Sequence, residues 1–182
     1  MNTTAIIAIV IAVIALAVAV WAVLQTLRTK HLRTKFGPEY DYMVNREGDR
    51  RKAEAELVQR EEQVRRLPIR DLTPQERDQF TSAWRQQQAR FVEEPRQVVL
   101  EADALVTQVM KTRGYPTANF DTQAAYASVD HSRVVGNYRE AHTIAERSRN
   151  GQTSTEELRR AMICYRTLFE DLVGSTVLTH RV

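Results

Sequence analysis

Two histidines and a tyrosine in the second half of the chain are the residues best suited to chemistry. On a predicted helix that begins after Asp130, His131, Tyr138 and His142 fall within about 40° of one line, because each helical residue turns by about 100°. Such a line on an apolar helix face could hold a small ligand. The alternative is that Asp130 caps the helix, while both histidines form hydrogen bonds at the edge of a bundle.

Distance excludes a metal ion shared by these two histidines. At about 1.5 Å per residue, a helix separates His131 from His142 by roughly 16 Å, whereas Zn–N bonds measure about 2 Å. The sequence has no Glu-x-x-His pair of the di-iron kind. It also has no phosphate-binding loop, nucleophile elbow, HExxH or CxxC motif. No catalytic, cofactor-binding or metal-binding residue is therefore predicted, and the sequence favours a protein that is not an enzyme.

The single cysteine, Cys164, limits redox chemistry. One thiol cannot form a disulfide within the chain, which is consistent with a reducing compartment. Cys164 lies in an apolar helical pattern, where a small buried hydrophobic residue is more common than a nucleophile.

The first apolar run extends from Ala5 to Leu24 and contains no charged residue, glycine or proline. Twenty residues at about 1.5 Å each cover roughly 30 Å, which is the thickness of the hydrocarbon core of a bilayer. Trp21 lies near the end of the run, where an amphipathic ring suits the membrane interface. The run predicts one transmembrane helix, whose partner is the lipid bilayer.

Four basic residues follow the run and form a basic collar: Arg28, Lys30, Arg33 and Lys35. The chain has 26 Lys and Arg and 23 Asp and Glu, and no acidic residue precedes Phe36. Because basic residues beside a span are retained in the cytoplasm, the collar predicts a single-pass protein of the inner (cytoplasmic) membrane. Its N-terminus would lie outside and its domain in the cytoplasm. The rest of the chain is close to neutral, which argues against nucleic-acid binding.

A cleaved signal peptide is the competing interpretation of the same run. Ala17-Val18-Ala19 fits a cleavage motif, but signal peptides have a basic start and a shorter apolar core. Residues 1–4 contain no Lys or Arg, and an alanine-rich run produces such motifs by chance. These departures favour an uncleaved anchor.

Alanine recurs along the apolar run at spacings of three and four residues. Six of its seven alanines share this stripe: Ala5, Ala8, Ala12, Ala15, Ala19 and Ala22. Small residues let two helix backbones approach closely, and a period of 3.5 implies a left-handed pair. The stripe predicts a homodimer, and the alternative is that alanine simply fills a membrane helix.

The composition favours an all-α fold, because Gly (6) and Pro (5) are scarce and no segment alternates like a strand. The predicted layout begins with a membrane anchor and collar (1–35), followed by one charged, solvated stalk helix (36–67). A small antiparallel bundle of about four helices (68–174) and a frayed tail (175–182) complete it. In the stalk, opposite charges three or four residues apart favour an exposed helix, and Gly48 is the expected place for a bend.

Start and stop signals define the helices of the predicted bundle. Thr73-Pro74-Gln75-Glu76 forms a capping box, as does Ser154 with Glu157. Gly114 is expected to end one helix, and Asp130 is expected to cap the next. Each predicted helix has a single apolar stripe, which it can bury only against the other helices.

Six short stretches stand out together: Phe36-Gly37-Pro38-Glu39-Tyr40-Asp41, Gly48-Asp49-Arg50-Arg51-Lys52-Ala53-Glu54, Arg113-Gly114-Tyr115-Pro116, Ser128-Val129-Asp130-His131, Asn137-Tyr138-Arg139, and Tyr165-Arg166 with Leu168-Phe169. With them the chain resembles a family of uncharacterised bacterial single-pass membrane-anchored proteins, some labelled only hypothetical or secreted. The resemblance covers Leu32 to Phe169 and implies an anchor followed by helices. It implies no activity and no catalytic residue, and the basic collar conflicts with the label "secreted".

Three functions are compatible with the sequence. The first is a membrane-tethered cytosolic helical module that binds an unidentified protein partner or a second copy of itself. The second is a small-ligand binder or enzyme that uses the face of His131, Tyr138 and His142. The third is an envelope structural protein that faces outward. A deep pocket at either histidine would favour the second function, and a flat exposed apolar patch would favour the first.

Overall fold

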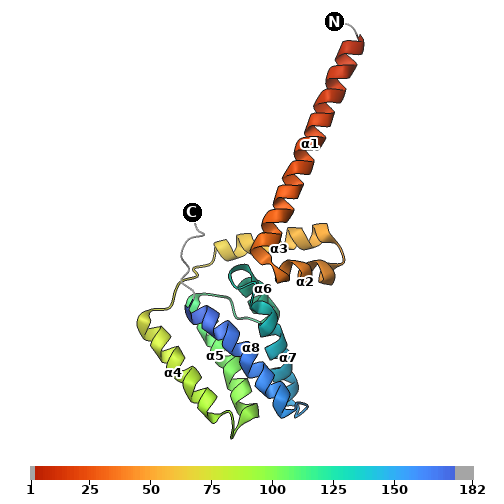
Figure 1. Cartoon of the computed structure of the whole chain (residues 1–182). Coiled ribbons are helices and arrows are strands. Elements are labelled where there is room, and N and C mark those ends of the chain that lie inside the picture. The colour runs from red at the N-terminus through yellow and green to blue at the C-terminus, as the bar shows by residue number, and fades with distance from the viewer. Residues whose placement is uncertain (1–2, 175–182) are drawn as a thin grey trace.

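The computed structural model describes residues 3–174, with side chains from residue 11 onward. Eight helices and no strand occur within these residues, so the all-α prediction is confirmed. The first helix, α1 (Thr3–Phe36), is long and apolar and projects from the other seven, which we call the body (Figure 1). The body contains α2 (Pro38–Glu47), α3 (Arg50–Arg65), α4 (Pro74–Arg90), α5 (Pro95–Arg113), α6 (Phe120–Asp130), α7 (Val135–Arg149) and α8 (Thr155–Gly174).

The bundle part of the body is built on α5, α7 and α8, which pack on one another, while α4 packs against α5 and α8. The apolar stripe of α5 is fully buried: Val98, Val99, Ala102, Val106 and Val109 have no exposed surface. Trp84 of α4 stacks on Phe169 of α8, with ring centroids 4.8 Å apart. Each helix therefore buries its single apolar face against its neighbours, as amphipathic helices must.

The predicted start and stop signals of three bundle helices are confirmed. Thr73 accepts a hydrogen bond from the backbone N–H of Glu76, and the Glu76 carboxylate accepts one from the backbone N–H of Thr73. Ser154 and Glu157 form the same reciprocal pair before α8. Gly114 ends α5 in the left-handed conformation, with φ of 96°. Local side-chain chemistry therefore sets these boundaries.

The helix predicted to begin at Asp130 begins five residues later. Asp130 is the last residue of α6, His131 is its C-cap, and α7 starts at Val135. The residues between α5 and α7 form a helix of their own, α6, and Asn119 caps it by accepting a hydrogen bond from the backbone N–H of Thr122. The bundle consequently has five helices between residues 74 and 174, where about four were expected.

The charged segment 36–67 differs from the single solvated stalk helix that its sequence suggested. It forms two helices, α2 and α3, which pack on each other and are separated at Gly48, a left-handed residue with φ of 66°. Asp49 then caps α3 by accepting hydrogen bonds from the backbone N–H groups of Arg51 and Lys52. Apolar residues of both helices enter the core: Tyr40, Met43, Ala53, Leu57 and Val64.

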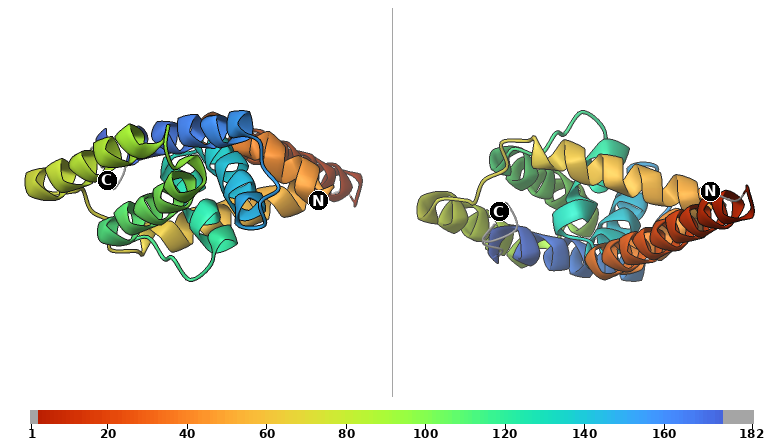
Figure 2. Two further views of the ribbon diagram at one scale, coloured as in Figure 1. Left: turned by 90° about the horizontal axis from the view of Figure 1, so that it is seen from below. Right: turned by 90° about the horizontal axis from the view of Figure 1, so that it is seen from above.

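The α2–α3 pair forms the end of the body from which α1 leaves. Viewed from above, α3 lies in front of the rest of the body (Figure 2). The last turns of α1 are part of this packing, because Leu32 is 1% exposed and Phe36 has no exposed surface. α1 is therefore continuous with the body, and no flexible linker separates them.

Candidate functional site

The exposed upper part of α1 is the most unusual surface of the molecule. The segment Ile11–Phe36 is long and apolar enough to cross a membrane by length and composition. Its large apolar side chains above the body are all at least half exposed, as in Leu16 at 66% and Leu24 at 59%. A soluble protein rarely leaves so large a continuous apolar surface in water.

The base of α1, residues 29–36, is fixed to the body by polar contacts as well as by packing. The Thr29 hydroxyl donates a 2.9 Å hydrogen bond to Glu54 of α3, and the Lys35 ammonium donates one of 2.8 Å to Glu61. The Ser132 hydroxyl, in the turn between α6 and α7, donates a 3.1 Å hydrogen bond to the Lys35 carbonyl. These contacts fix the direction in which α1 leaves the body.

The four residues of the basic collar have different surroundings. Lys35 pairs with Glu61, and Arg33 lies 3.8 Å from Asp41. Arg28 and Lys30 are exposed and form no salt bridge with any described residue. The two collar residues nearest the apolar segment are therefore free to contact other anions.

A buried ionic cluster connects the α2–α3 pair to the bundle. The Glu39 carboxylate accepts hydrogen bonds of 2.6 and 2.7 Å from Arg139 of α7 and one of 3.1 Å from Arg60 of α3. Arg60 also donates a 3.0 Å hydrogen bond to the Ser128 hydroxyl of α6. Glu39 and Arg60 are 2% and 4% exposed. Arg60 also pairs with Glu56 at 2.6 Å, so four helices meet at a group of two carboxylates and two guanidinium groups, which is costly to break once buried.

The sequence analysis missed this cluster, although α3 contains a signal for part of it. Arg60 occupies a position of the buried stripe that also contains Ala53, Leu57 and Val64. An arginine at helical spacing within an apolar stripe implies a buried guanidinium that needs a carboxylate partner. Nothing in the local sequence indicates that the partner is Glu39, because the two residues lie on different helices.

The structure places His131 outside α7, in the turn after α6, so it does not continue the line of Tyr138 and His142. The His131 Nδ1 atom forms a short hydrogen bond with the Asp171 carboxylate of α8. Its Nε2 atom lies 3.3 Å from the Tyr115 hydroxyl, which donates a 2.8 Å hydrogen bond to Asp130. The imidazole is therefore held on both sides, and its side chain is only 2% exposed.

The hydrogen bonds among His131, Asp171, Tyr115 and Asp130, which we call the His131 cluster, shift the pKa values of two of its members. The hydrogen bond from His131 lowers the pKa of Asp171, against the opposing effect of burial. Burial and the nearby Asp130 carboxylate raise the pKa of Tyr115 far above its ordinary value of 10.0. Tyr115 therefore stays protonated and acts as a hydrogen-bond donor, so the cluster is a chain of satisfied polar groups.

The structure brings Tyr138 and His142 together on α7, with ring centroids 6.5 Å apart. His142 stacks on Phe120 of α6 at 3.7 Å between ring centroids, and its Nδ1 atom lies 3.2 Å from Asp103 of α5. Asp103 also accepts a 2.8 Å hydrogen bond from Tyr165 of α8. This second cluster resembles the first, because a carboxylate holds the imidazole between helices.

A groove with a volume of about 640 Å³ lies beside α7, near these residues. Its four basic lining residues each pair with a carboxylate: Arg46 binds Glu47 at 2.9 Å, Arg139 binds Glu39 at 2.6 Å, Arg147 binds Glu157 at 2.6 Å, and Arg160 binds Glu140 at 3.0 Å. Neither His131 nor His142 lines the groove. It therefore does not connect the two histidine clusters into one ligand site.

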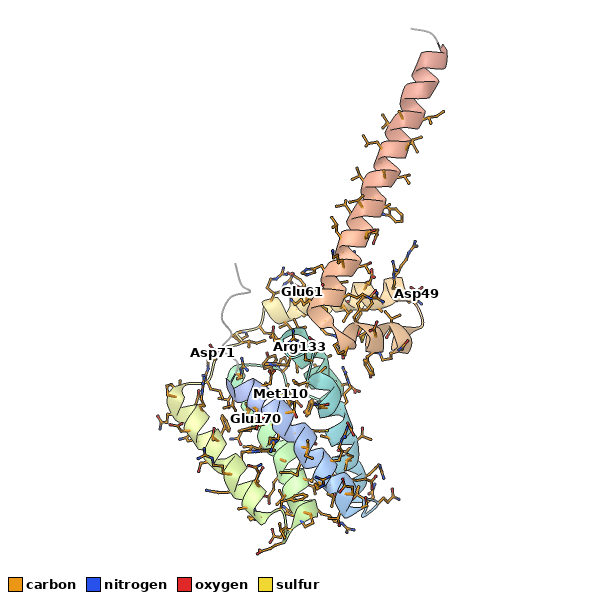
Figure 3. The ribbon with its side chains drawn as sticks, viewed as in Figure 1. Asp49, Glu61, Asp71, Met110, Arg133 and Glu170 are labelled. Carbon is orange, nitrogen blue, oxygen red and sulfur yellow. The ribbon has the colours of Figure 1, made fainter. Side chains whose placement is uncertain are left out.

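Across the described side chains, no group of three or more His, Cys, Asp and Glu residues is arranged to hold a metal ion. Figure 3 shows Glu61 beside the base of α1 and Asp49 at the turn between α2 and α3, with Arg133 and Asp71 below them and Glu170 further down the body. The ionisable side chains at the centre of the body are paired with one another, whereas α1 exposes a continuous apolar surface. Comparison with protein families, curated proteins and solved structures gave no match, so the resemblance noted in the sequence stays a prediction.

Proposed function

We propose that the protein is a single-pass, membrane-anchored helical module whose body lies at the cytoplasmic face of the inner membrane. The observation that supports this function is the exposed apolar surface of α1, which no part of the body covers from Ile11 to Leu27. Moving each large apolar side chain out of water is favourable by about 1.5–3 kcal/mol. A bilayer covers all of them at once, because the helix satisfies its own backbone hydrogen bonds.

The continuity of α1 with the body argues for an anchor over a cleaved leader. Cleavage after Ala19 would leave large apolar side chains exposed on the remaining helix, including Trp21 at 54%, Leu24 at 59% and Leu27 at 57%. The same helix continues without a break to Phe36, which is buried in the core. Removing the upper half of such a helix would therefore create a new exposed apolar end.

The orientation follows from the charges next to the apolar segment. Arg28 and Lys30 are exposed just below it, and basic residues at this position are retained in the cytoplasm. Lys35 and Arg33 belong to the same collar, although they pair with carboxylates of the body. Acidic residues contribute little to the orientation of a membrane span, so these ion pairs do not change the predicted orientation. The alternative is an envelope protein with the body outside.

The role of the body is to bind protein, either a partner or a second copy of the chain. His131 and His142 each contact a carboxylate between packed helices. This arrangement supports a structural role for both histidines over the alternative of ligand binding. Ala12, Ala15 and Ala19 lie on the exposed part of α1, where a second α1 helix could approach closely.

Membrane insertion is tested by placing charge in the apolar segment of the full chain. Leu16→Arg combined with Val20→Arg is expected to move the protein from the alkali-resistant membrane fraction to the soluble fraction, because an arginine at the centre of a span costs about 2.5–3.5 kcal/mol. Val92→Arg is the control, since Val92 is 88% exposed on the body. A mature mass that lacks residues 1–19 would overturn the anchor.

Orientation is tested by fusing reporters after Val182. A reporter that works only in the cytoplasm is expected to be active, and one that works only outside the inner membrane is expected to be inactive. Changing Arg28, Lys30, Arg33 and Lys35 to Gln should reduce this bias. The opposite reporter pattern in the native chain would place the body outside and support the envelope function.

Self-association is tested by enlarging the alanine stripe. Ala12→Leu with Ala15→Leu should weaken dimer cross-linking in membranes, because the larger side chains separate the two backbones. Ala17→Leu is a matched control, since Ala17 is the one alanine of the run that lies off the stripe. Equal cross-linking in all three proteins would eliminate dimerisation through this face.

A further inference from the structure

The position of α3 relative to α1 determines which part of the body meets a membrane first. In Figure 1, α3 runs across the end of the body from which α1 rises, and in the view from above in Figure 2 it lies in front of the other body helices. Two side chains of α3 contact the base of α1, because Glu54 accepts a hydrogen bond from Thr29 and Glu61 accepts one from Lys35. α3 is thus held beside α1.

The depth of α3 follows from the residue on α1 that it contacts. Leu27 is the last large exposed apolar residue of α1, at 57% exposure, and Thr29 is only two residues further along the helix. Two residues correspond to about 3 Å along the axis. The headgroup layer on each side of the hydrocarbon core is roughly 5–7 Å thick. If the apolar segment ends at the hydrocarbon boundary, the part of α3 around Glu54 lies at the level of the lipid headgroups. The part around Glu61 is held at Lys35, about 12 Å along α1 from Leu27, and lies further from the hydrocarbon core.

The face of α3 that points away from the body can be read from its contacts. Ala53, Leu57, Arg60 and Val64 face the core, and Glu54 and Glu61 face α1. At about 100° per residue, the side opposite the core contains the positions of Arg51, Ala55, Val58, Gln59, Glu62 and Arg65 and of the C-cap residue Arg66, with Lys52 at its margin. All of these except Glu62, which is half-buried, are exposed.

This outer side is strongly basic. Arg51 and Lys52 form no salt bridge among the described residues, and Arg65 and Arg66 share the Glu62 carboxylate at 2.8 and 3.0 Å. We call Arg51, Lys52, Arg65 and Arg66 the basic face of α3. Val58 lies on the same side and is 37% exposed. Clusters of Lys and Arg directly beside a membrane span are attracted to anionic lipid headgroups.

We infer that α3 is an interfacial helix, whose basic face binds the phosphate groups of anionic phospholipids in the leaflet that α1 leaves. This inference rests on the proposed anchor, because α1 sets the depth of α3. The exposed Arg28 and Lys30 of the collar extend the same basic surface up to the span. Contacts at α1 and along α3 together hold the body in one orientation, with the distal end of α4 and α5 away from the membrane.

The test uses the full chain in vesicles of phosphatidylglycerol and phosphatidylcholine, labelled at one introduced cysteine in a Cys164→Ala background. Val58→Cys reports on α3, Val92→Cys on the distal end of the body, and Leu16→Cys on the span. A quencher attached to lipid headgroups should quench the probe at residue 58 and leave the probe at residue 92 bright. A quencher in the acyl chains should quench the probe at residue 16.

Charge is tested by changing the basic face of α3 to glutamine at all four positions. Each basic residue near an anionic surface changes the docked-to-undocked ratio by about fivefold, so the quadruple variant should lose most of the quenching at residue 58. Vesicles of phosphatidylcholine alone should have the same effect on the native chain. A charge-matched control replaces four exposed arginines elsewhere: Arg85, Arg96, Arg159 and Arg166. Circular dichroism checks that both variants remain helical.

The outcomes separate the interfacial helix from the anchor. A bright probe at residue 58 together with a quenched probe at residue 16 would overturn the interfacial helix and leave the anchor standing. Bright probes at both positions would overturn the anchor itself. Equal quenching at residue 58 in the quadruple variant and its charge-matched control would show that the basic face does not bind lipid, and would also overturn the inference.

Discussion

Arg139 of α7 binds both carboxylate oxygens of Glu39 in α2, at 2.6 and 2.7 Å, although the two residues are 100 positions apart in the chain. This pair joins the end of the body that holds α1 to the bundle. Glu39 simultaneously accepts a hydrogen bond from the buried Arg60, whose charge is also balanced by Glu56 at 2.6 Å. Glu39 therefore links α2, which follows α1 directly, to both α3 and the bundle helix α7.

Glu39→Gln should destabilise the body strongly. The amide has no negative charge, so Glu56, which lies 2.6 Å from Arg60, is the one carboxylate left in the cluster for the guanidinium groups of Arg60 and Arg139. Breaking a buried ion pair in this way costs about 3–5 kcal/mol. Guanidinium unfolding of the detergent-solubilised chain, followed by circular dichroism, measures the loss.

Glu47→Gln is the control for this prediction, because it removes a more exposed partner of Arg46 from a 2.9 Å pair. Exposed pairs contribute about 0–1 kcal/mol. A similar loss of unfolding free energy in the two variants would contradict a special role for Glu39.

Gly114→Ala should destabilise the fold more than the same substitution at Gly48 or at Gly136. Gly114 has a φ of 96°, and an added Cβ would lie 2.6 Å from the Pro68 carbonyl oxygen. Gly48 has a φ of 66° but open space around it, so only the left-handed conformation penalises alanine there, by about 1–2 kcal/mol. Gly136 lies in a helix with open space, where alanine is favoured by up to about 1 kcal/mol.

Thermal unfolding of these three alanine variants gives the expected order directly. The midpoint should be lowest for Gly114→Ala, intermediate for Gly48→Ala and highest for Gly136→Ala. If the unfolding temperature of Gly114→Ala is equal to or higher than that of Gly48→Ala, the backbone at Pro68 moves away from the added methyl group with no loss of stability.

The sequence was sufficient to predict features that depend on neighbouring residues. The apolar segment of α1, the capping box at Thr73 and the left-handed stop at Gly114 are local, and each is present as predicted. The segment 36–67 was misjudged because its charges suggest solvent on all sides. Its charged residues are partly buried because they pair across helices, and tertiary pairing is not visible in local sequence.

The same limit applies to the histidine residues. A helical line through His131, Tyr138 and His142 required one continuous helix, but α6 ends at Asp130 and α7 begins at Val135. The partners of His131 and His142 are Asp171 and Asp103, about 40 residues away in the sequence in each case. Packing of α5 and α8 against the other helices brings these carboxylates to the imidazoles, which helical periodicity alone does not reveal.

Trp84→Ala should release α4 from the bundle. Phe80 and Trp84 are the only buried residues of α4, and Trp84 stacks on Phe169 at 4.8 Å. Losing a buried tryptophan costs about 3–5 kcal/mol, so amide hydrogen exchange should accelerate in α4 more than in α5. Trp21→Ala is the control, because Trp21 is 54% exposed on α1 and should leave exchange in the body unchanged. Uniform acceleration across the bundle would contradict local release.

Stability should fall in acid through Asp171. Its hydrogen bond from His131 holds the pKa of Asp171 below the ordinary value of 3.8, and Arg113 and Arg133 act in the same direction. A carboxylate with a lowered folded-state pKa stabilises the fold above its unfolded pKa, and this contribution is lost as pH falls through the folded pKa. The free energy of unfolding should therefore decline between about pH 5 and pH 2, and this decline should be less steep for Asp171→Asn.

His131→Leu should reduce the pH dependence of the unfolding free energy by a similar amount, because it removes the imidazole that donates the hydrogen bond to Asp171. The double variant should flatten it no further than either single change, since both remove one interaction. Denaturant unfolding at a series of pH values measures all four slopes, and additive flattening in the double variant would show that Asp171 and His131 act separately.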